Sequence, residues 1–278
     1  MGVSLNGKAV AENLRNEIRK SIEVKKANGE KVPCMANILV GNDGGSLHYV
    51  NNQNKVCADL GIEVKSIYLD EKITEEEITK VICDLNNDNN INGIILQLPL
   101  PKHLDEAKIT SLISFEKDID GLNTVSVGKL YKGEKCFIPC TPRGIIELIK
   151  STGEKIEGKH AVVIGRSNIV GKPVAQLLLN ENATVTICHS RTDNLKEICS
   201  KADILVAAIG KPGFVTEEFV KENAIVIDVG TTAVNGKLAG DVCFDRVIEK
   251  ASFVTPVPGG VGAMTTTMLL KNLCEGIE

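Results

Sequence analysis

The sequence predicts an α/β protein with two domains, because short apolar segments of strand type alternate with helical segments along most of the chain. The length of 278 residues, divided by about 150 residues per domain, corresponds to roughly two domains with a core each. Hydrophobic residues make up 43% and charged residues 24%, as in folded globular domains rather than disordered chains. We therefore expect parallel sheets built from βαβ units in both halves.

The first half of the chain alternates helix and strand. Its predicted helices are residues 6–27, with charges on one face, residues 46–60, which stop at Gly61, and a helix that Thr74 caps ahead of three acidic residues. Its predicted strands are the apolar or β-type runs of residues 35–40, 63–69 and 93–98.

The second half continues the alternation. Its predicted helices are residues 141–150, a helix that ends at Leu179, and a last helix at about 264–276; its predicted strands are residues 160–164, 184–188, 204–209 and 224–229. The boundary between the halves is expected around residues 115–145. We therefore predict one domain of residues 1–140 plus a C-terminal helix at about 264–278, and a second domain of residues 141–263.

Charge and aromatic content argue against two classes of partner. The formal charge is −4 and the pI is near 5.7, without a basic cluster, which argues against nucleic-acid binding. Six Phe, three Tyr and no Trp leave few side chains for stacking on bases. No apolar run approaches the roughly 18 residues that span a bilayer, and the N-terminus lacks the apolar core of a signal peptide. We expect a cytoplasmic protein with no membrane partner.

The nine cysteines are scattered, and no Cys-x-x-Cys pair occurs among them. Cys136 and Cys140 are four residues apart but have no matching His or Cys cluster nearby. Buried, reduced thiols are therefore expected, with no metal site and no disulfides.

A glycine turn follows the strand at 160–164 and runs from Gly165 to Pro173. A tight turn between a strand and a helix points backbone N–H groups at an anion, as in dinucleotide-binding folds. The spacing departs from Gly-x-Gly-x-x-Gly, because Ser167 takes the middle position and the last glycine comes one residue late, at Gly171. Alone, this pattern is equally typical of an ordinary βα turn.

The end of the next strand indicates which dinucleotide would bind. An NAD site usually has Asp or Glu there to hold the ribose hydroxyls, but residues 188–191 contain no acid. Ser190 and Arg191, together with Arg166 in the glycine turn, suit a ribose 2′-phosphate and favour NADP. The alternative is that both arginines are surface residues without a ligand.

Four polar or glycine-rich features have both a functional and a structural interpretation. Tyr49 and Gln53 are four residues apart on a predicted helix and therefore share a face. The two side chains form either a polar site or an exposed hydrogen-bonded pair. Gln97 ends a buried strand, where a polar side chain needs a partner and where ligands collect. Residues 118–121 are at least as typical of a turn as of a binding site. The backbone of residues 256–262 either approaches a ligand closely or forms a plain linker.

Taken together, these segments resemble the methylenetetrahydrofolate dehydrogenase/methenyltetrahydrofolate cyclohydrolase family over essentially the whole chain. The matching segments, in order, are Ser46–Val50, Gln97–Pro101, Lys117–Gly121, Cys140–Gly144, Gly165–Pro173 and Pro256–Gly262. The resemblance implies two α/β domains with a cleft between them, the C-terminal one a Rossmann-type NADP-binding domain, in a homodimer. It implies that 5,10-methylenetetrahydrofolate gives hydride to NADP⁺ and forms the 5,10-methenyl cation. In bifunctional members, water then opens that cation to 10-formyltetrahydrofolate.

The resemblance also implies roles for individual residues. Tyr49 would line the folate pocket, Gln97 would be a polar partner at the reaction centre, and Asp120 would hold the pterin. The backbone of the glycine-rich segment would contact folate at Pro258, Gly259 and Gly260. NADP would be held by Gly165, Arg166, Ser167, Ser190 and Thr231.

One departure from the family pattern bears directly on catalysis. The family's catalytic lysine stands four residues after the tyrosine, and here that position is Gln53. Lys55 is six residues from Tyr49, roughly 240° around a helix, and cannot simply substitute. Further departures are Ser126, Thr232 and Ala263.

Losing the lysine should affect the two reactions differently. Hydride transfer depends mostly on positioning, whereas hydration needs a group that manages protons. Glutamine has no titratable proton, although it can still orient a water molecule. We expect dehydrogenase activity with an impaired cyclohydrolase step. The alternatives are a fully bifunctional enzyme that uses another group, and a non-catalytic folate- or nucleotide-binding protein.

Overall fold

The computed structural model describes residues 1–41 and 44–277, and the chain divides into two compact units. Unit 1 comprises Met1–Asn13 and Pro139–Met268, and unit 2 comprises Leu14–Ile138 and Leu269–Glu278. Helices α1 (Gly7–Ala27) and α10 (Thr265–Glu275) each contribute residues to both units.

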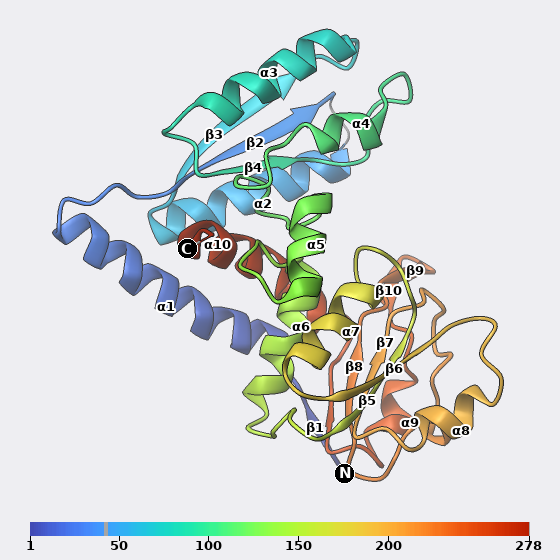
Figure 1. Cartoon of the computed structure of the whole chain (residues 1–278). Coiled ribbons are helices and arrows are strands. Elements are labelled where there is room, and N and C mark those ends of the chain that lie inside the picture. The colour runs from blue at the N-terminus through green and yellow to red at the C-terminus, as the bar shows by residue number, and fades with distance from the viewer. Residues whose placement is uncertain (42–43, 278) are drawn as a thin grey trace. The chain divides into compact units, whose positions relative to one another are not determined.

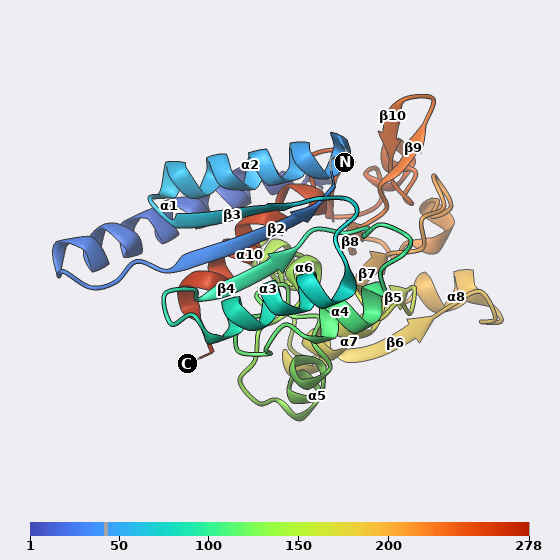
Figure 2. The same cartoon turned by 90° about the horizontal axis from the view of Figure 1, so that it is seen from above.

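Unit 2 is built on a three-stranded parallel sheet in the order β3–β2–β4. The strands are β2 (Cys34–Val40), β3 (Glu63–Leu69) and β4 (Gly93–Leu96). Its further helices are α2 (Gly44–Leu60), α3 (Glu75–Asn87), α4 (Glu106–Ser111) and α5 (Thr124–Lys132). Figures 1 and 2 show α2 and α3 on opposite faces of this sheet.

The two-residue period of β2 and β4 divides their side chains between these faces. One hydrophobic cluster joins Ala36, Ile38 and Val40 of β2 with Ile94 and Leu96 of β4 and with apolar residues of α3 and α4. The intervening residues of both strands therefore face the α2 side. Asn37, and Gln97 just beyond β4, belong to this second set.

Gly93 begins β4 where no side chain fits. A Cβ atom there would lie 2.5 Å from Cγ2 of Ile119 and 2.9 Å from Cδ1 of Leu273, both in unit 2. We expect Gly93→Ala to destabilise the protein by about 1–3 kcal/mol, because the core around it must shift. Gly128→Ala is the matched control, since nothing lies within 4 Å of that position in α5, and it should stabilise by about 0.5–1 kcal/mol. Urea unfolding measures both, and equal effects would contradict the packing argument.

Unit 1 contains a six-stranded sheet in the order β1–β11–β8–β7–β5–β6, with every pairing parallel. The strands are β1 (Val3–Ser4), β5 (His160–Ile164), β6 (Thr184–Cys188), β7 (Ile204–Ala207), β8 (Ile225–Asp228) and β11 (Phe253–Val254). Its helical segments are α6 (Cys140–Ser151), α7 (Gly171–Asn180), α8 (Leu195–Cys199), α9 (Phe244–Val247), η1 (Glu217–Phe219) and η2 (Val261–Ala263). Because β6 and β7 flank β5 on opposite sides, the chain reverses its direction of travel at β5, and such switch points bind ligands in open α/β sheets.

The first residues of the chain lie in unit 1 of the structure. The predicted first domain includes residues 1–13, and the structural division places these residues in unit 1. The reason is that β1 adds to the sheet beside β11, with Leu5 N–H donating to the Val254 carbonyl at 2.8 Å. At the other end, the division falls inside α10, between Met268 and Leu269, rather than before the helix.

A hairpin in unit 1 was not among the predicted elements. Strands β9 (Thr232–Val234) and β10 (Lys237–Ala239) pair antiparallel across Asn235 and Gly236, which have φ of 50° and 76°. Asn-Gly with two positive φ values is a strong hairpin signal, so the sequence did contain the information.

The remaining features of residues 1–41 and 44–277 concern membrane-spanning helices, metal-ligand clusters and buried thiols. No helix there has the length and apolar character that a membrane span needs. No group of three His, Cys, Asp or Glu side chains within this part could hold a metal ion. Cys57 and Cys199 are buried thiols, and burial raises the pKa of each to about 12.

Candidate functional site

Three buried carboxamides form a hydrogen-bonded cluster on the α2 face of the unit 2 sheet. We call Asn37, Gln53 and Gln97 the amide triad. Asn37 Nδ2 donates to Gln53 Oε1 at 2.9 Å, and Gln97 Nε2 donates to Gln53 Oε1 at 3.0 Å and to Asn37 Oδ1 at 2.9 Å. Their exposed fractions are 1%, 5% and 9%. The partner that Gln97 requires at the end of its strand is thus supplied by two other amides.

The helix α2 carries Gln53 on its buried face. Val50, Val56 and Cys57 are buried with it, at spacings of three and four residues. Tyr49, one turn earlier, is 46% exposed and lies at the edge of this face, whereas Lys55 is exposed. Lys55 therefore lies on a different face of α2 from Gln53. The six-residue spacing between Tyr49 and Lys55 predicts this arrangement. The side chains of Ser46 and His48 fall outside the described part of the structure.

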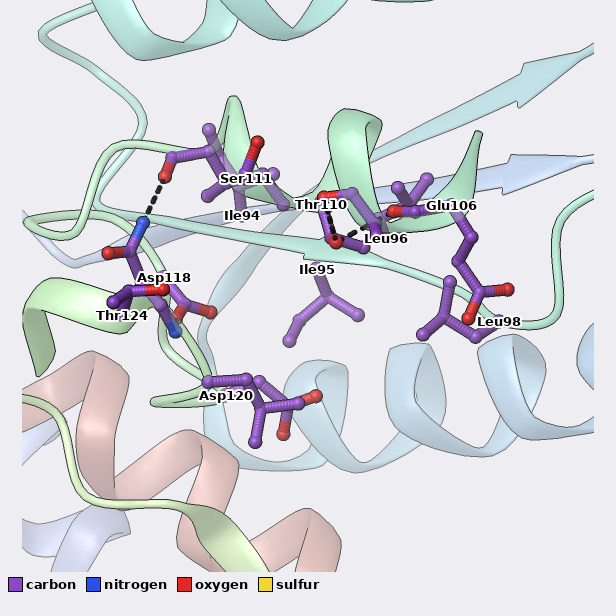
Figure 3. Close-up of a pocket in the computed structure, with 14 residues that line it drawn as sticks. Ile94, Ile95, Leu96, Leu98, Glu106, Thr110, Ser111, Asp118, Asp120 and Thr124 are labelled. Atoms are coloured by element: carbon purple, nitrogen blue, oxygen red, sulfur yellow. Dashed lines mark hydrogen bonds between the residues drawn. The ribbon is translucent and has the colours of Figure 1, made fainter. Parts of the chain in front are cut away.

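A pocket of about 470 Å³ in unit 2 contains Asp120. Figure 3 shows Asp120 and Ile95 on the side of β4 that faces α2, with Glu106 and Thr110 of α4 on the other side. The turn from Asp118 to Gly121 thus both reverses the chain and presents a half-buried carboxylate to a cavity. The structural and functional interpretations of this motif are compatible.

Asp118, two residues earlier, organises that turn. Its Oδ2 accepts the Asn123 N–H at 2.5 Å, and its backbone bridges to Ile94 of β4. Burial raises the pKa of Asp118 to about 6, the Asn123 N–H opposes that rise, and the nearby Asp120 charge adds to it. Ser126, one of the departures from the family pattern that the sequence resembles, is 1% exposed, and its hydroxyl has no hydrogen-bond partner among the described residues.

The glycine turn of unit 1 is packed too tightly for side chains at two positions. Gly165 has φ of 124°, and a Cβ there would lie 2.2 Å from the Ala208 carbonyl oxygen. A Cβ at Gly171, the first residue of α7, would lie 2.4 Å from the Gly165 carbonyl oxygen. The turn follows β5 at the switch point of the sheet. This close approach of backbone to backbone explains why glycine stands at both positions.

The polar residues of this turn and of the next strand end are accessible. Ser167 Oγ accepts the N–H groups of Val170 and Gly171 at 3.2 Å each, so its side chain orders the turn. Arg166 is exposed on the same turn, and Ser190 and Arg191 are exposed after β6, the strand that pairs with β5. This register brings together the strand ends from which the sequence predicts contacts to a ribose phosphate.

A second pocket, of about 260 Å³, lies within unit 1. It unites Thr231 with Pro258, Gly259 and Gly260, residues that sequence analysis assigns to two different ligands. Lys8, at the start of α1, also lines this pocket and was not among the predicted site residues. The glycine-rich segment is therefore a cavity wall rather than a plain linker.

Two buried acids, Asp228 and Asp241, hold the loops at this edge of the sheet. Asp241 is 0% exposed and accepts the N–H groups of Ile209, Gly210 and Lys211. Asp228 accepts those of Gly230, Asp241 and Val242. Burial raises the pKa of Asp228 to about 6, although these three N–H groups favour the carboxylate. Neither acid is among the predicted site residues, because their partners come from segments up to 32 residues away.

Comparison with known proteins gives a consistent result for both units. The family model described as the catalytic domain of tetrahydrofolate dehydrogenase/cyclohydrolase matches residues 5–120, and the one described as its NAD(P)-binding domain matches residues 139–278. A Clostridium novyi protein named bifunctional protein FolD is 71% identical over 278 residues, which is 100% of both chains.

Two solved structures show the same relationship. The bifunctional FolD methylenetetrahydrofolate dehydrogenase/cyclohydrolase of Campylobacter jejuni has a TM-score of 0.94 and 42% identity, covering 99% of this chain and 98% of that one. The FolD enzyme of Trypanosoma brucei, complexed with NADP cofactor and inhibitor, has a TM-score of 0.89 and 39% identity, covering 98% and 96%. With both of its domains matched in order, this chain belongs to the tetrahydrofolate dehydrogenase/cyclohydrolase family.

Proposed function

We propose that the chain oxidises 5,10-methylenetetrahydrofolate to 5,10-methenyltetrahydrofolate with NADP⁺, and that it opens the methenyl cation poorly. One observation carries the second half of this proposal. Position 53, where the family has its catalytic lysine, holds a glutamine that is 5% exposed and hydrogen-bonded to Asn37 and Gln97. Such a group binds and orients ligands but does not titrate.

Each unit by itself contains residues that are proposed to contact folate. In unit 2, Tyr49 would line the pocket, Gln53 and Gln97 would contact the reacting portion, and Asp120 would bind the pterin. In unit 1, the backbone at Pro258, Gly259 and Gly260 would approach the substrate. A half-buried Asp120 beside a 470 Å³ cavity supports this assignment.

NADP would be held by Gly165, Arg166, Ser167, Ser190, Arg191 and Thr231. When bound, it supplies the hydride acceptor of the dehydrogenase reaction. The close packing at Gly165, the two accessible arginines and the NADP-bound relative from Trypanosoma brucei support this choice. The task left to the protein is to hold the donor carbon in line with the acceptor and to exclude water.

Hydration of the methenyl cation makes a different demand, since the attacking water must lose a proton as its C–O bond forms. A lysine with a lowered pKa can accept it, but an amide oxygen is far too weak a base. Lys55 is exposed on α2 and not on the Gln53 face, so it does not fill the role. We therefore expect the methenyl product to accumulate.

A coupled assay tests the proposal. Purified protein is mixed with 5,10-methylenetetrahydrofolate and NADP⁺, and NADPH and methenyl absorbance are followed separately. We expect methenyl to rise in step with NADPH. If NADPH rises alone, both reactions occur and the proposed impairment is wrong. If neither rises while both ligands bind, the chain is a binding protein rather than an enzyme.

A fully bifunctional enzyme is the second candidate, because the 71% identical relative is named bifunctional. It would require a proton acceptor other than residue 53.

The proposal also includes the homodimer that the family resemblance implies, which sedimentation of the purified chain tests.

A further inference from the structure

We propose that Asn37 is a positioning residue that fixes the carboxamide of Gln53 with its carbonyl oxygen turned into the protein and its NH₂ group left for the folate. The inference rests on the proposed function for the identity of the ligand. It adds a residue that neither the sequence motifs nor the family resemblance assigns.

Asn37 is a polar residue in an otherwise apolar segment. It lies in the central strand β2, where the five residues from Met35 to Leu39 are all buried, and it is itself 1% exposed. A buried amide is costly unless both of its ends are hydrogen-bonded. Both ends are used, because Nδ2 donates to Gln53 Oε1 and Oδ1 accepts from Gln97 Nε2, each at 2.9 Å.

The pattern of donors and acceptors ties the orientation of Gln53 to that of Asn37. Its Oε1 accepts two hydrogen bonds, from Asn37 and from Gln97. If the Gln53 amide alone were reversed, its NH₂ group would face two N–H donors and both bonds would be lost, so its orientation follows that of Asn37. Gln53 uses only its oxygen in the triad and Gln97 uses only its nitrogen, whereas Asn37 uses both. Asn37 is therefore the member that sets the direction of the other two.

The fixed direction has a chemical consequence. Among the side chains that the structure describes, Gln53 Nε2 and Gln97 Oε1 take no part in the hydrogen bonds of the triad, and on the proposed function they are the atoms that would meet the ligand. Position 53 then offers an N–H donor to an electron-rich atom of the substrate, as a lysine ammonium would. It does not offer an acceptor for the proton that water must lose. The triad thus keeps the donor function of the lysine without its basicity.

A double-mutant cycle tests the role of Asn37. The probe is the stable reduced folate 5-formyltetrahydrofolate, and its dissociation constant is measured by calorimetry, so the result does not depend on turnover. The four proteins are the wild type, Asn37→Leu, Gln53→Met and the double variant. Leucine has a similar volume and suits the apolar strand. The control is Met35→Leu, which lies two residues away on the same face of β2, and it should bind like the wild type.

We expect Asn37→Leu to weaken binding about tenfold when Gln53 is present, because an unfixed amide loses most of one oriented hydrogen bond. In the Gln53→Met background the same change should cost no more than about threefold, since there is no Gln53 to orient. The affinity for NADP, whose predicted site lies in unit 1, should not change in any variant. Asn37→Asp, which accepts but does not donate, should reverse Gln53 and weaken binding at least as much.

An equal loss in both backgrounds would show that Asn37 only supports the fold, and an unchanged affinity in Asn37→Leu would also overturn the inference. If Asn37→Leu does not fold, the Asn37→Asp comparison in the same two backgrounds decides between these outcomes. Rapid methenyl hydrolysis with the expected coupling would contradict the proposed function alone. No binding of the probe by the wild type would contradict both.

Discussion

Gly165→Ala is expected to lower the affinity for NADP by at least about 100-fold, the loss of two hydrogen bonds to charged phosphate at about 1.5 kcal/mol each. The added Cβ would lie 2.2 Å from the Ala208 carbonyl oxygen, and φ of 124° is strained for alanine. Backbone atoms cannot yield as a flexible side chain can, so the whole turn must move. Its N–H groups would then no longer converge on one anion. NADPH fluorescence titration measures the change.

Leu179→Ala is the matched control for this experiment. It removes a side chain that is 55% exposed near the other end of α7, so NADP should bind as in the wild type. A folded Gly165→Ala protein that binds NADP within threefold of the wild type would show that the glycine turn is not the cofactor cradle.

Asp241→Ala is expected to destabilise the protein by about 3–5 kcal/mol, because three backbone N–H groups lose their acceptor at once. These groups belong to Ile209, Gly210 and Lys211 and lie 2.7, 3.1 and 2.6 Å from the carboxylate oxygens. Water cannot readily replace a side chain that is 0% exposed. Urea unfolding gives the change in the free energy of unfolding.

The exposed acid Asp193 of unit 1 provides the comparison, and its replacement by alanine should change stability by less than about 0.5 kcal/mol. If Asp241→Ala costs less than about 1 kcal/mol, the loops around β7 and β8 do not depend on this carboxylate. The account of how this edge of the sheet is built would then be wrong.

Local sequence patterns were sufficient for most of the long elements. The predicted strands at 63–69, 160–164 and 184–188 have the same bounds as β3, β5 and β6, because each is a β-type run ended by turn residues. The predicted helix at 6–27 is one residue longer than α1. What local pattern could not supply was pairing between distant segments. The two-residue strand β1 exists only because Phe253 and Val254 lie beside it.

In the candidate site, too, local motifs predict some residues, whereas others depend on contacts between distant segments. Motifs predict Gln53, Gln97 and Asp120 as site residues, and the switch-point topology explains why the glycine turn lies where it does. The predicted strand at 35–40 contains Asn37, and one amide among the apolar residues of a buried strand indicates a partner. Its actual partners are 16 and 60 residues away, and no periodicity within β2 points to them. Lys8 and Asp241 were missed for the same reason.

The central claim is that position 53 holds an oriented donor and no base, and one measurement tests it most directly. Purified protein is given 5,10-methenyltetrahydrofolate without any dinucleotide, and the decay of methenyl absorbance is compared with that in buffer alone. We expect decay at the buffer rate, even at protein concentrations that give rapid NADPH formation in the coupled assay. Protein-dependent decay as fast as NADPH formation would contradict it and show that another group manages the proton.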